Sequence, residues 1–173
     1  AVHVYDRLVA AGPEFGLRHA GTKALASLRM EKGYRDYGHD IDNTDCPLDA
    51  GFGFAIAWDK PGGFIGLPAL AERRHVPRRQ RLVSLQVLEP DPLLYHAEVL
   101  RRDGAPVGYV RAGSYGHTLG GAVGLAMVQA GRDAATADWL AAGRWTVEIN
   151  GNEYPAAMSL RPLYDPDNAR IGS

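Results

Sequence analysis

The stretch SLRMEKGYRDYGHDIDNTDCPLDAG, residues 27–51, carries the densest chemistry in this chain. A helical pattern that ends in Arg29 and Glu31 meets Gly33, and a polar loop with two Tyr, one His and four Asp follows before Pro47. Ordered loops of this composition often line a site, because rigid elements hold their polar and aromatic groups together. A well-capped connection with solvated acids is the alternative, and residue types alone favour neither interpretation.

The helix before this loop is predicted over residues 23–32, with Thr22 as its N-cap and Gly33 at the C′ position, where glycine adopts a left-handed conformation at little cost. Glu31 lies at the C-terminal end, where an anion opposes the helix macrodipole by about 0.3–1 kcal/mol. A carboxylate in a disfavoured place is a hint of a role. Residues two apart do not face each other on a helix, so Arg29 is expected to find a partner elsewhere and to anchor the following loop.

Three further elements are predicted around this core stretch. Ala1–Ala11 has the spacing of an amphipathic helix that Gly12-Pro13 ends. The glycine-rich apolar run Gly51–Trp58 predicts a strand buried on at least one face, in which glycines admit a flat ligand or another backbone. A short helix is predicted over Pro68–Arg74, with proline in its first turn.

From Arg81 onward the pattern changes to short alternating segments separated by turn signals. Two hairpins are predicted, around Asp103-Gly104 and around Asn150-Gly151. The predicted strands are Arg81–Leu88, Ala97–Arg102, Pro106–Ala112, Gly124–Val128, Trp145–Ile149 and Glu153–Leu160. Such a series predicts a small antiparallel barrel or sandwich. The fold class is therefore α+β, with a first domain at residues 1–76 and a second at 77–173.

Composition excludes several classes of function. The formal net charge of -1 gives no reason to expect a nucleic-acid partner, and no apolar run approaches the roughly 20 residues of a membrane span. Cys46 is the only cysteine, so no internal disulfide can form, which fits a reducing compartment and predicts a cytoplasmic location. No metal-ligand spacing surrounds it, and we assign no catalytic or metal-binding residue. The basic run at residues 73–81 is interpreted as a solvated linker rather than a phosphate groove.

Four blocks resemble a known family when they are taken in order. LRMEKG (28–33), YGHDID (37–42), PLDAGFGF (47–54) and FIGLPAL (64–70) are similar to the second half of the aminomethyltransferase family, which comprises the glycine-cleavage T-protein and its relatives. The resemblance runs from about Gly16 to Asp165, and it implies the second half of the folate-binding domain followed by a C-terminal antiparallel β-barrel.

The dehydrogenase branch of this family is the most similar. EKGYR (31–35) and LRPLYDP (160–166) resemble the folate-binding C-terminal region of FAD-dependent dimethylglycine and sarcosine dehydrogenases. Leu25 stands where T-proteins usually have Arg, as it does in that branch. The resemblance implies a C-terminal fragment of a longer parent that oxidises an N-methylated amine with FAD and passes the one-carbon unit to tetrahydrofolate. The FAD and the main folate contacts would belong to the N-terminal half of that parent.

A binding site for tetrahydrofolate needs a carboxylate, apolar or aromatic walls and a cation near the glutamate tail of the ligand. The candidate folate-binding residues are Glu31, Tyr37, Phe54 and Lys60. Glu31 and Arg29 are expected to brace the loop in preference to contacting ligand, and His117 is expected in a surface turn. On this hypothesis the fragment alone is inactive and forms one wall of the folate chamber.

Two rival functions stay open on the sequence. One is a fragment of a stand-alone glycine-cleavage-type aminomethyltransferase, and the other is a non-catalytic folate-binding or structural module. In the structural case, the exposed face of the helices within residues 1–32 is expected to drive formation of a homodimer.

Overall fold

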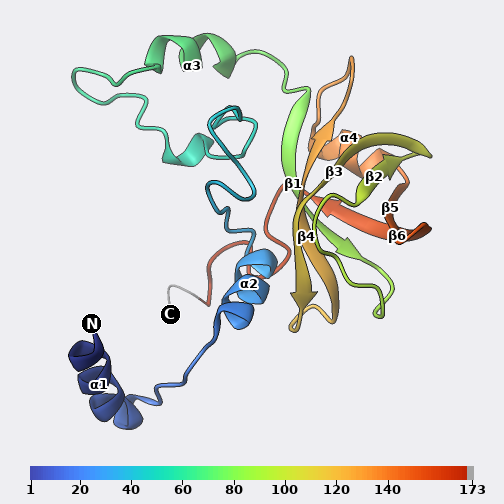
Figure 1. Ribbon diagram of the computed structural model, residues 1–173. Helices are drawn as coiled ribbons and strands as arrows, with labels where there is room; N and C mark the ends of the chain where they lie inside the picture. Colours follow the sequence, from blue (N-terminus) through green and yellow to red (C-terminus); the bar gives the residue numbers. More distant parts are fainter. Residues whose placement is uncertain (171–173) are drawn as a thin grey trace.

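A closed barrel of six antiparallel strands forms the centre of the protein (Figure 1). The computed structural model describes residues 1–170; the last three residues of the second predicted domain, 171–173, lie outside the described residues. Around the barrel the strand order is β1-β4-β3-β2-β5-β6, with β6 pairing back to β1. The strands are β1 Gln80–Val87, β2 Val99–Arg102, β3 Ala105–Gly116, β4 Gly121–Gln129, β5 Trp145–Ile149 and β6 Asn152–Ser159. The predicted α+β class and the antiparallel barrel are confirmed.

Both predicted hairpins are present, and the backbone angles of their turns explain why Asp-Gly and Asn-Gly occupy them. Asp103 and Gly104 have φ of 53° and 82°, and Asn150 and Gly151 have φ of 51° and 80°. Two successive positive φ angles match the twist of the flanking strands, and Asp-Gly and Asn-Gly adopt them readily. These two short sequences therefore fix the pairing of β2 with β3 and of β5 with β6.

Strand β4 is buried along nearly its whole length because both of its faces are covered. Alternate residues of a strand point to opposite faces. One set joins the core cluster to which all six strands contribute: Ala122, Ala126 and Val128. The other set packs with Met30 and Ile41 in a second cluster: Val123, Leu125 and Met127. The barrel interior and the layer outside β4 are thus two separate apolar cores.

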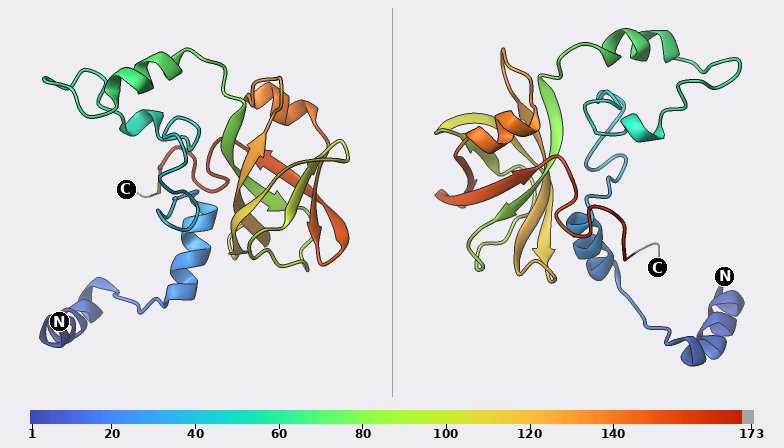
Figure 2. Two further views of the ribbon diagram at one scale, coloured as in Figure 1. Left: turned by 45° about the horizontal axis from the view of Figure 1, so that its top comes forward. Right: turned by 180° about the vertical axis from the view of Figure 1, so that it is seen from behind.

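The helices differ sharply in how they are packed. α2 (Thr22–Glu31) lies against the barrel, whereas α1 (Val2–Ala11) and α3 (Leu67–Arg74) stand away from it in every view (Figures 1 and 2). Neither α1 nor α3 contains a buried residue. The remaining helical segments are η1 Gly12–Phe15, η2 Gly53–Ala55 and α4 Ala137–Ala142. Within residues 1–170 no helix combines the length and apolar character needed to cross a membrane.

The strand predicted over Gly51–Trp58 is wrong. This run forms a turn and the short 3-10 helix η2. Gly51 has φ of 81°, and the amide of Phe52 donates to the carbonyl of Pro47 at 2.8 Å, so the backbone curls back on itself. No strand pairs with it among the described residues, and the Phe54 side chain is 83% exposed. An apolar run without a partner strand cannot satisfy its backbone as β-structure.

Only the C-terminal end of α2 agrees with the prediction. Gly21, not Thr22, is the N-cap, and no side chain caps the helix there; Thr22 already lies within it. At the other end Gly33 has φ of 64°, and the amide of Tyr34 donates to the carbonyl of Arg29 at 2.9 Å. The left-handed glycine is confirmed, and it turns the chain directly from the helix into the polar loop.

Candidate functional site

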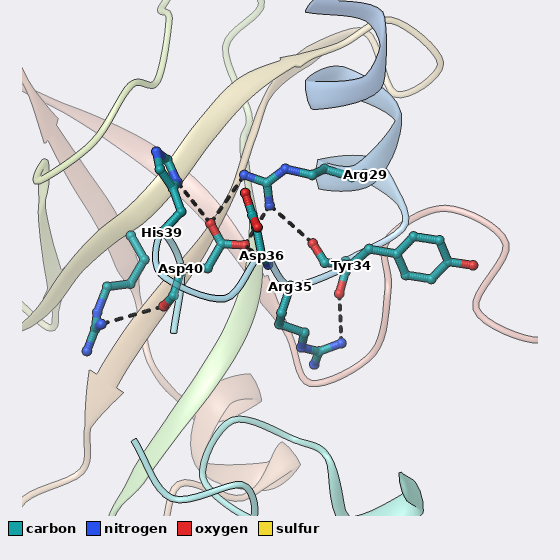
Figure 3. A network of polar contacts seen from close by, with 8 residues as sticks. Arg29, Tyr34, Arg35, Asp36, His39 and Asp40 are labelled. Carbon is teal, nitrogen blue, oxygen red and sulfur yellow. Dashed lines mark hydrogen bonds and ion pairs between the residues drawn. The ribbon is translucent and has the colours of Figure 1, made fainter. Parts of the chain in front are cut away.

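The last turn of α2 and the polar loop are joined by a buried ion pair between Arg29 and Asp40 (Figure 3). Arg29 Nη1 donates to Asp40 Oδ2 at 2.5 Å and to the Tyr34 carbonyl at 3.2 Å. The backbone amide of Asp36 donates to the same carboxylate at 2.8 Å, and Asp40 has no exposed surface. Arg29 therefore anchors the loop, as predicted, and Asp40 is the buried acid that holds it.

His39 presents the polar edge of this network to solvent. Its Nδ1 lies 3.3 Å from Asp40 Oδ1, while its side chain is 58% exposed. The ring of His96, which lies between β1 and β2 in the chain, is 6.4 Å away between centroids. A buried carboxylate thus orients an accessible imidazole, which is an arrangement able to accept or donate a proton.

The loop is further ordered by its own hydrogen bonds and by β3. The hydroxyl and amide of Thr44 donate to Asp42 Oδ1 at 2.6 and 2.7 Å, and they lower the pKa of Asp42 below its ordinary value. From β3, Arg111 Nη2 lies 3.4 Å from Asp45 Oδ1. A loop restrained at both ends and in the middle can hold side chains in fixed positions.

Glu31 is buried and faces the turn between β3 and β4. Its Oε1 accepts from the amides of Thr118 at 2.7 Å and Leu119 at 3.0 Å, and its Oε2 accepts from the Thr118 hydroxyl at 2.9 Å. His117, in the same turn, is exposed as expected. Both carboxylate oxygens of Glu31 are therefore used inside the protein, where they fasten α2 to the barrel.

Lys32 makes a second fastening, to the segment that follows β6. Its Nζ lies 2.9 Å from Asp165 Oδ2 and also donates to the Asp165 carbonyl. Both side chains are almost fully buried, and the amide of Tyr164 donates to the Glu31 carbonyl at 3.1 Å. The hydrogen bond from Lys32 holds the pKa of Asp165 below its ordinary value.

Two cavities border this region. One, of about 670 Å³, lies between α2, the polar loop and the barrel. Its polar lining residues include Arg29, Tyr34, Arg35, Asp36, His39 and His96. The Asp36 carboxylate has no hydrogen-bond partner among residues 1–170, and burial lowers the pKa of Arg35. The other cavity, of about 430 Å³, is mainly apolar: Pro47, Phe52, Ala55, Ile56, Ala57, Lys60, Phe64 and Leu70 line it.

The structure does not bring the four predicted folate-binding residues together in one of these cavities. Lys60 lines the smaller cavity. Phe54 lies beside that cavity, with its ring 6.2 Å from the ring of Phe52. Tyr37 is 69% exposed on the loop, and Glu31 is buried against the β3–β4 turn. Tyr37, Phe54 and Glu31 line neither cavity, so the folate contacts of all four residues stay predictions.

Sequence reasoning missed Phe52, Asp36 and the pair of His39 with Asp40. The four Asp of the loop look alike in the sequence, and only the fold shows that Asp40 is buried while Asp36 faces a cavity. His96 is distant from the loop in the chain and had no local signal. The one available hint was Arg29, whose guanidinium required a carboxylate from outside the helix.

Comparison with known proteins places this geometry in a family. The model of the GCVT N-terminal domain matches residues 1–60, and the model of the glycine cleavage T-protein C-terminal barrel domain matches residues 80–165. The chain belongs to the glycine cleavage T-protein family. The second match coincides with the six-stranded barrel, and the first with the segment that contains α2 and the polar loop.

The chain is similar to two kinds of relatives: an amine oxidase and dehydrogenase on one side, and an aminomethyltransferase on the other. The 4-methylaminobutanoate oxidase (formaldehyde-forming) of Paenarthrobacter nicotinovorans is 44% identical over 99% of this chain and 20% of its own length. The mitochondrial sarcosine dehydrogenase of Mus musculus is 34% identical over 97% of this chain and 18% of its own. An aminomethyltransferase of Thermoanaerobacter pseudethanolicus is 33% identical over 74% of this chain and 34% of its own. The chain thus spans about a fifth to a third of the length of these relatives.

A solved structure shares the fold. The crystal structure of glycine cleavage system aminomethyltransferase T from Bartonella henselae superposes with a TM-score of 0.78 at 22% identity. The match covers 96% of this chain and 44% of that one. The outlying helices α1 and α3 are therefore included in the shared arrangement for the most part, although neither contains a buried residue.

Proposed function

We propose that this chain is the tetrahydrofolate-binding C-terminal portion of an FAD-dependent dehydrogenase or oxidase of N-methylated amines. In this role it helps transfer the one-carbon unit to tetrahydrofolate, while FAD binds to another part of the parent protein. The observation that carries the proposal is the extent of the matches: the oxidase and the sarcosine dehydrogenase match nearly the whole chain, whereas the aminomethyltransferase matches about three quarters of it.

The residues that line the two cavities fit parts of a reduced folate. Phe52 and Phe64 offer aromatic walls to an aryl arm, and Lys60 beside them offers a cation for a carboxylate tail. In the larger cavity the free carboxylate of Asp36 can accept hydrogen bonds from the amino and ring NH groups of a pterin. Glu31 has both oxygens occupied, so in this proposal it supports the site without contacting ligand. Tyr37 and Phe54 supply outer walls.

The exposed apolar face of helix α1 indicates a surface that binds a second partner. Val4, Tyr5 and Leu8 are all more than half exposed on it. Exposed apolar faces of this kind mark interaction surfaces. We assign this face to the preceding part of the parent chain, and a homodimer of the isolated chain is the competing occupant.

Two alternatives have specific support. The names of both matching domain models favour a glycine-cleavage-type aminomethyltransferase, which needs no flavin in this proposal. The printed name of the oxidase, formaldehyde-forming, favours a parent that releases the one-carbon unit as formaldehyde. A cytoplasmic location stays a prediction from the single cysteine, and the sarcosine dehydrogenase relative is named as mitochondrial.

The test is calorimetric titration of tetrahydrofolate into this chain and, in parallel, into the full-length parent. Lys60→Ala and Phe52→Ala are expected to weaken binding about tenfold or more, because each removes a contact from the same cavity. Arg144→Ala is the control, since that exposed side chain has no ion pair or hydrogen bond among the described residues. The parent preparation is also examined for flavin absorbance.

Each result separates the proposals. Binding by chain and parent, lost in Lys60→Ala but not in Arg144→Ala, supports the folate site described above. Binding by the parent alone assigns the decisive contacts to the preceding segment. Absence of binding in both refutes the folate role, and a parent without flavin refutes the dehydrogenase branch. Formaldehyde release that tetrahydrofolate leaves unchanged favours the formaldehyde-releasing alternative.

A further inference from the structure

The basic run at residues 73–81 connects α3 to β1 and is mostly exposed, as the linker interpretation predicts, and it also borders a cleft. A cleft of about 390 Å³ lies where the end of α3 meets the start of β1, and its lining is rich in arginine: Arg73, Arg78, Arg79 and Arg132. Arg132 follows β4 and lies 53 positions after Arg79 in the chain. Only the fold brings it next to the basic run. The cleft shares no lining residue with either of the two cavities described above.

Negative charge in this cleft is scarce. Asp49 is its one acidic lining residue, and Arg73 Nη2 already lies 3.2 Å from Asp49 Oδ2. Among residues 1–170, the side chains of Arg78, Arg79 and Arg132 have neither an ion pair nor a hydrogen bond to protein. The chain as a whole has a formal charge of -1. A local excess of cations in a nearly neutral chain focuses a positive potential into the cleft.

Arg81, which lies next to this cleft, adds to its excess of positive charge. It lines the hollow on the other side of Pro77 and Arg78, and its Nε is buried without a hydrogen-bond partner. Burial lowers the pKa of Arg81, and the charge of Arg78 lowers it further. Several like charges lie close together here, and the one carboxylate that lines the cleft is already paired. Their repulsion destabilises the folded chain, and a bound anion would reduce it.

We propose that this cleft binds a small anion that carries at least two phosphate or carboxylate groups. The planar guanidinium fork matches either group with paired hydrogen bonds, and several such forks around one cleft select for more than one anionic group. The volume suits a small molecule rather than a polymer. The proposal concerns a surface apart from the folate site and does not depend on the proposed function.

The experiment is calorimetric titration of the 173-residue chain with inorganic pyrophosphate in one arm and citrate in the other, at low salt. Arg78→Ala and Arg132→Ala are each expected to weaken binding about tenfold. Since neither side chain makes a hydrogen bond or ion pair among the described residues, both variants are expected to fold, and thermal melting checks this. Arg7→Ala on the outlying helix α1 is the matched control, because it removes one arginine far from the cleft.

A variant with the opposite expected effect sharpens the test. Asp49→Asn removes the single carboxylate of the cleft and releases Arg73, so it is expected to tighten anion binding several-fold. Raising the salt concentration is expected to weaken binding, because the cleft is open to solvent and its charges are screened.

Binding of either anion that is weakened by Arg78→Ala and Arg132→Ala and unchanged by Arg7→Ala supports the site, and the arm that binds more tightly identifies phosphate or carboxylate chemistry. Dissociation constants weaker than about 1 mM for both anions overturn the proposal. Equal effects of all three arginine variants also overturn it, because they would indicate a diffuse charge effect.

Discussion

Glu31 at the end of α2 accepts hydrogen bonds from both the amide and the hydroxyl of Thr118, at 2.7 and 2.9 Å, although 87 positions separate the two residues. The helix and the β3–β4 turn belong to the regions matched by two different domain models. An ionised acceptor at this junction explains why a carboxylate is tolerated at an unfavourable helix end. The contact fixes the orientation of α2, and with it the wall of the larger cavity.

Glu31→Gln is expected to lower the free energy of unfolding by about 2 kcal/mol. A neutral amide loses the charge-assisted bonds: its oxygen can still accept from the backbone amides of Thr118 and Leu119, but its NH₂ group replaces the oxygen that accepted from the Thr118 hydroxyl. Chemical denaturation measures the change. Glu72→Gln on α3 is the control, since Glu72 is exposed, and a loss of equal size there would show that the effect is not specific to the junction.

Asp40→Asn is expected to cost about 3 kcal/mol of stability and to disorder the loop. The change leaves the guanidinium of Arg29, only 17% exposed, without its anionic partner, and breaking a buried pair from one side is strongly destabilising. Denaturation gives the free energy, and the NMR signals of His39 and His96 report on the loop. Asp91→Asn at an exposed position is the control. An unchanged loop would mean that the backbone hydrogen bonds within residues 36–41 and the contact of Arg111 with Asp45 hold it without the ion pair.

The barrel could be predicted from the sequence because its signals are local. Asp103-Gly104 and Asn150-Gly151 specify tight turns, and alternating apolar segments flank them. Gly51–Trp58 had similar apolar composition, yet it curls into a turn, because a strand also needs a partner and no strand pairs with this run within residues 1–170. Composition thus predicts a strand well only where a neighbouring hairpin supplies the pairing.

The site was less predictable, since its key contacts join distant segments. The anchoring role of Arg29 followed from helix spacing alone, but its partner did not. The basic run is an exposed linker, as predicted, but the cleft that it lines could not be predicted, because Arg132 lies far along the chain. Glu31 was expected to brace the polar loop, but the fold shows that its carboxylate binds the β3–β4 turn instead.

Gly108 in β3 is expected to tolerate no side chain. A Cβ at this position would lie 2.0 Å from the carbonyl oxygen of Met127 on β4, and a backbone atom in a closed barrel has little freedom to move away. Gly108→Ala is therefore expected to destabilise the barrel by about 1–3 kcal/mol. Gly53→Ala in η2 is the matched control, because a Cβ there meets only the Leu48 side chain, at 3.9 Å, which is ordinary van der Waals contact. Equal melting temperatures for the two variants would contradict the expectation.

The bond between Lys32 and Asp165 predicts how stability changes with pH. The hydrogen bond from Lys32 lowers the pKa of Asp165 in the folded chain below its ordinary value of 3.8, so the unfolded chain binds this proton more readily. The stabilisation is therefore fully present above pH 3.8 and is lost as the pH falls through the lowered value. In Asp165→Asn this contribution is absent at every pH. The difference in free energy of unfolding between the wild type and Asp165→Asn is expected to be constant near neutral pH and to shrink below pH 3.8.

Denaturant unfolding at a series of pH values measures this difference, with Asp59→Asn as the control because Asp59 is exposed and has no ion pair among residues 1–170. That control is expected to track the wild type throughout. A difference that widened on acidification would mean that Asp165 is protonated more readily in the folded chain, opposite to the direction that its contact with Lys32 imposes.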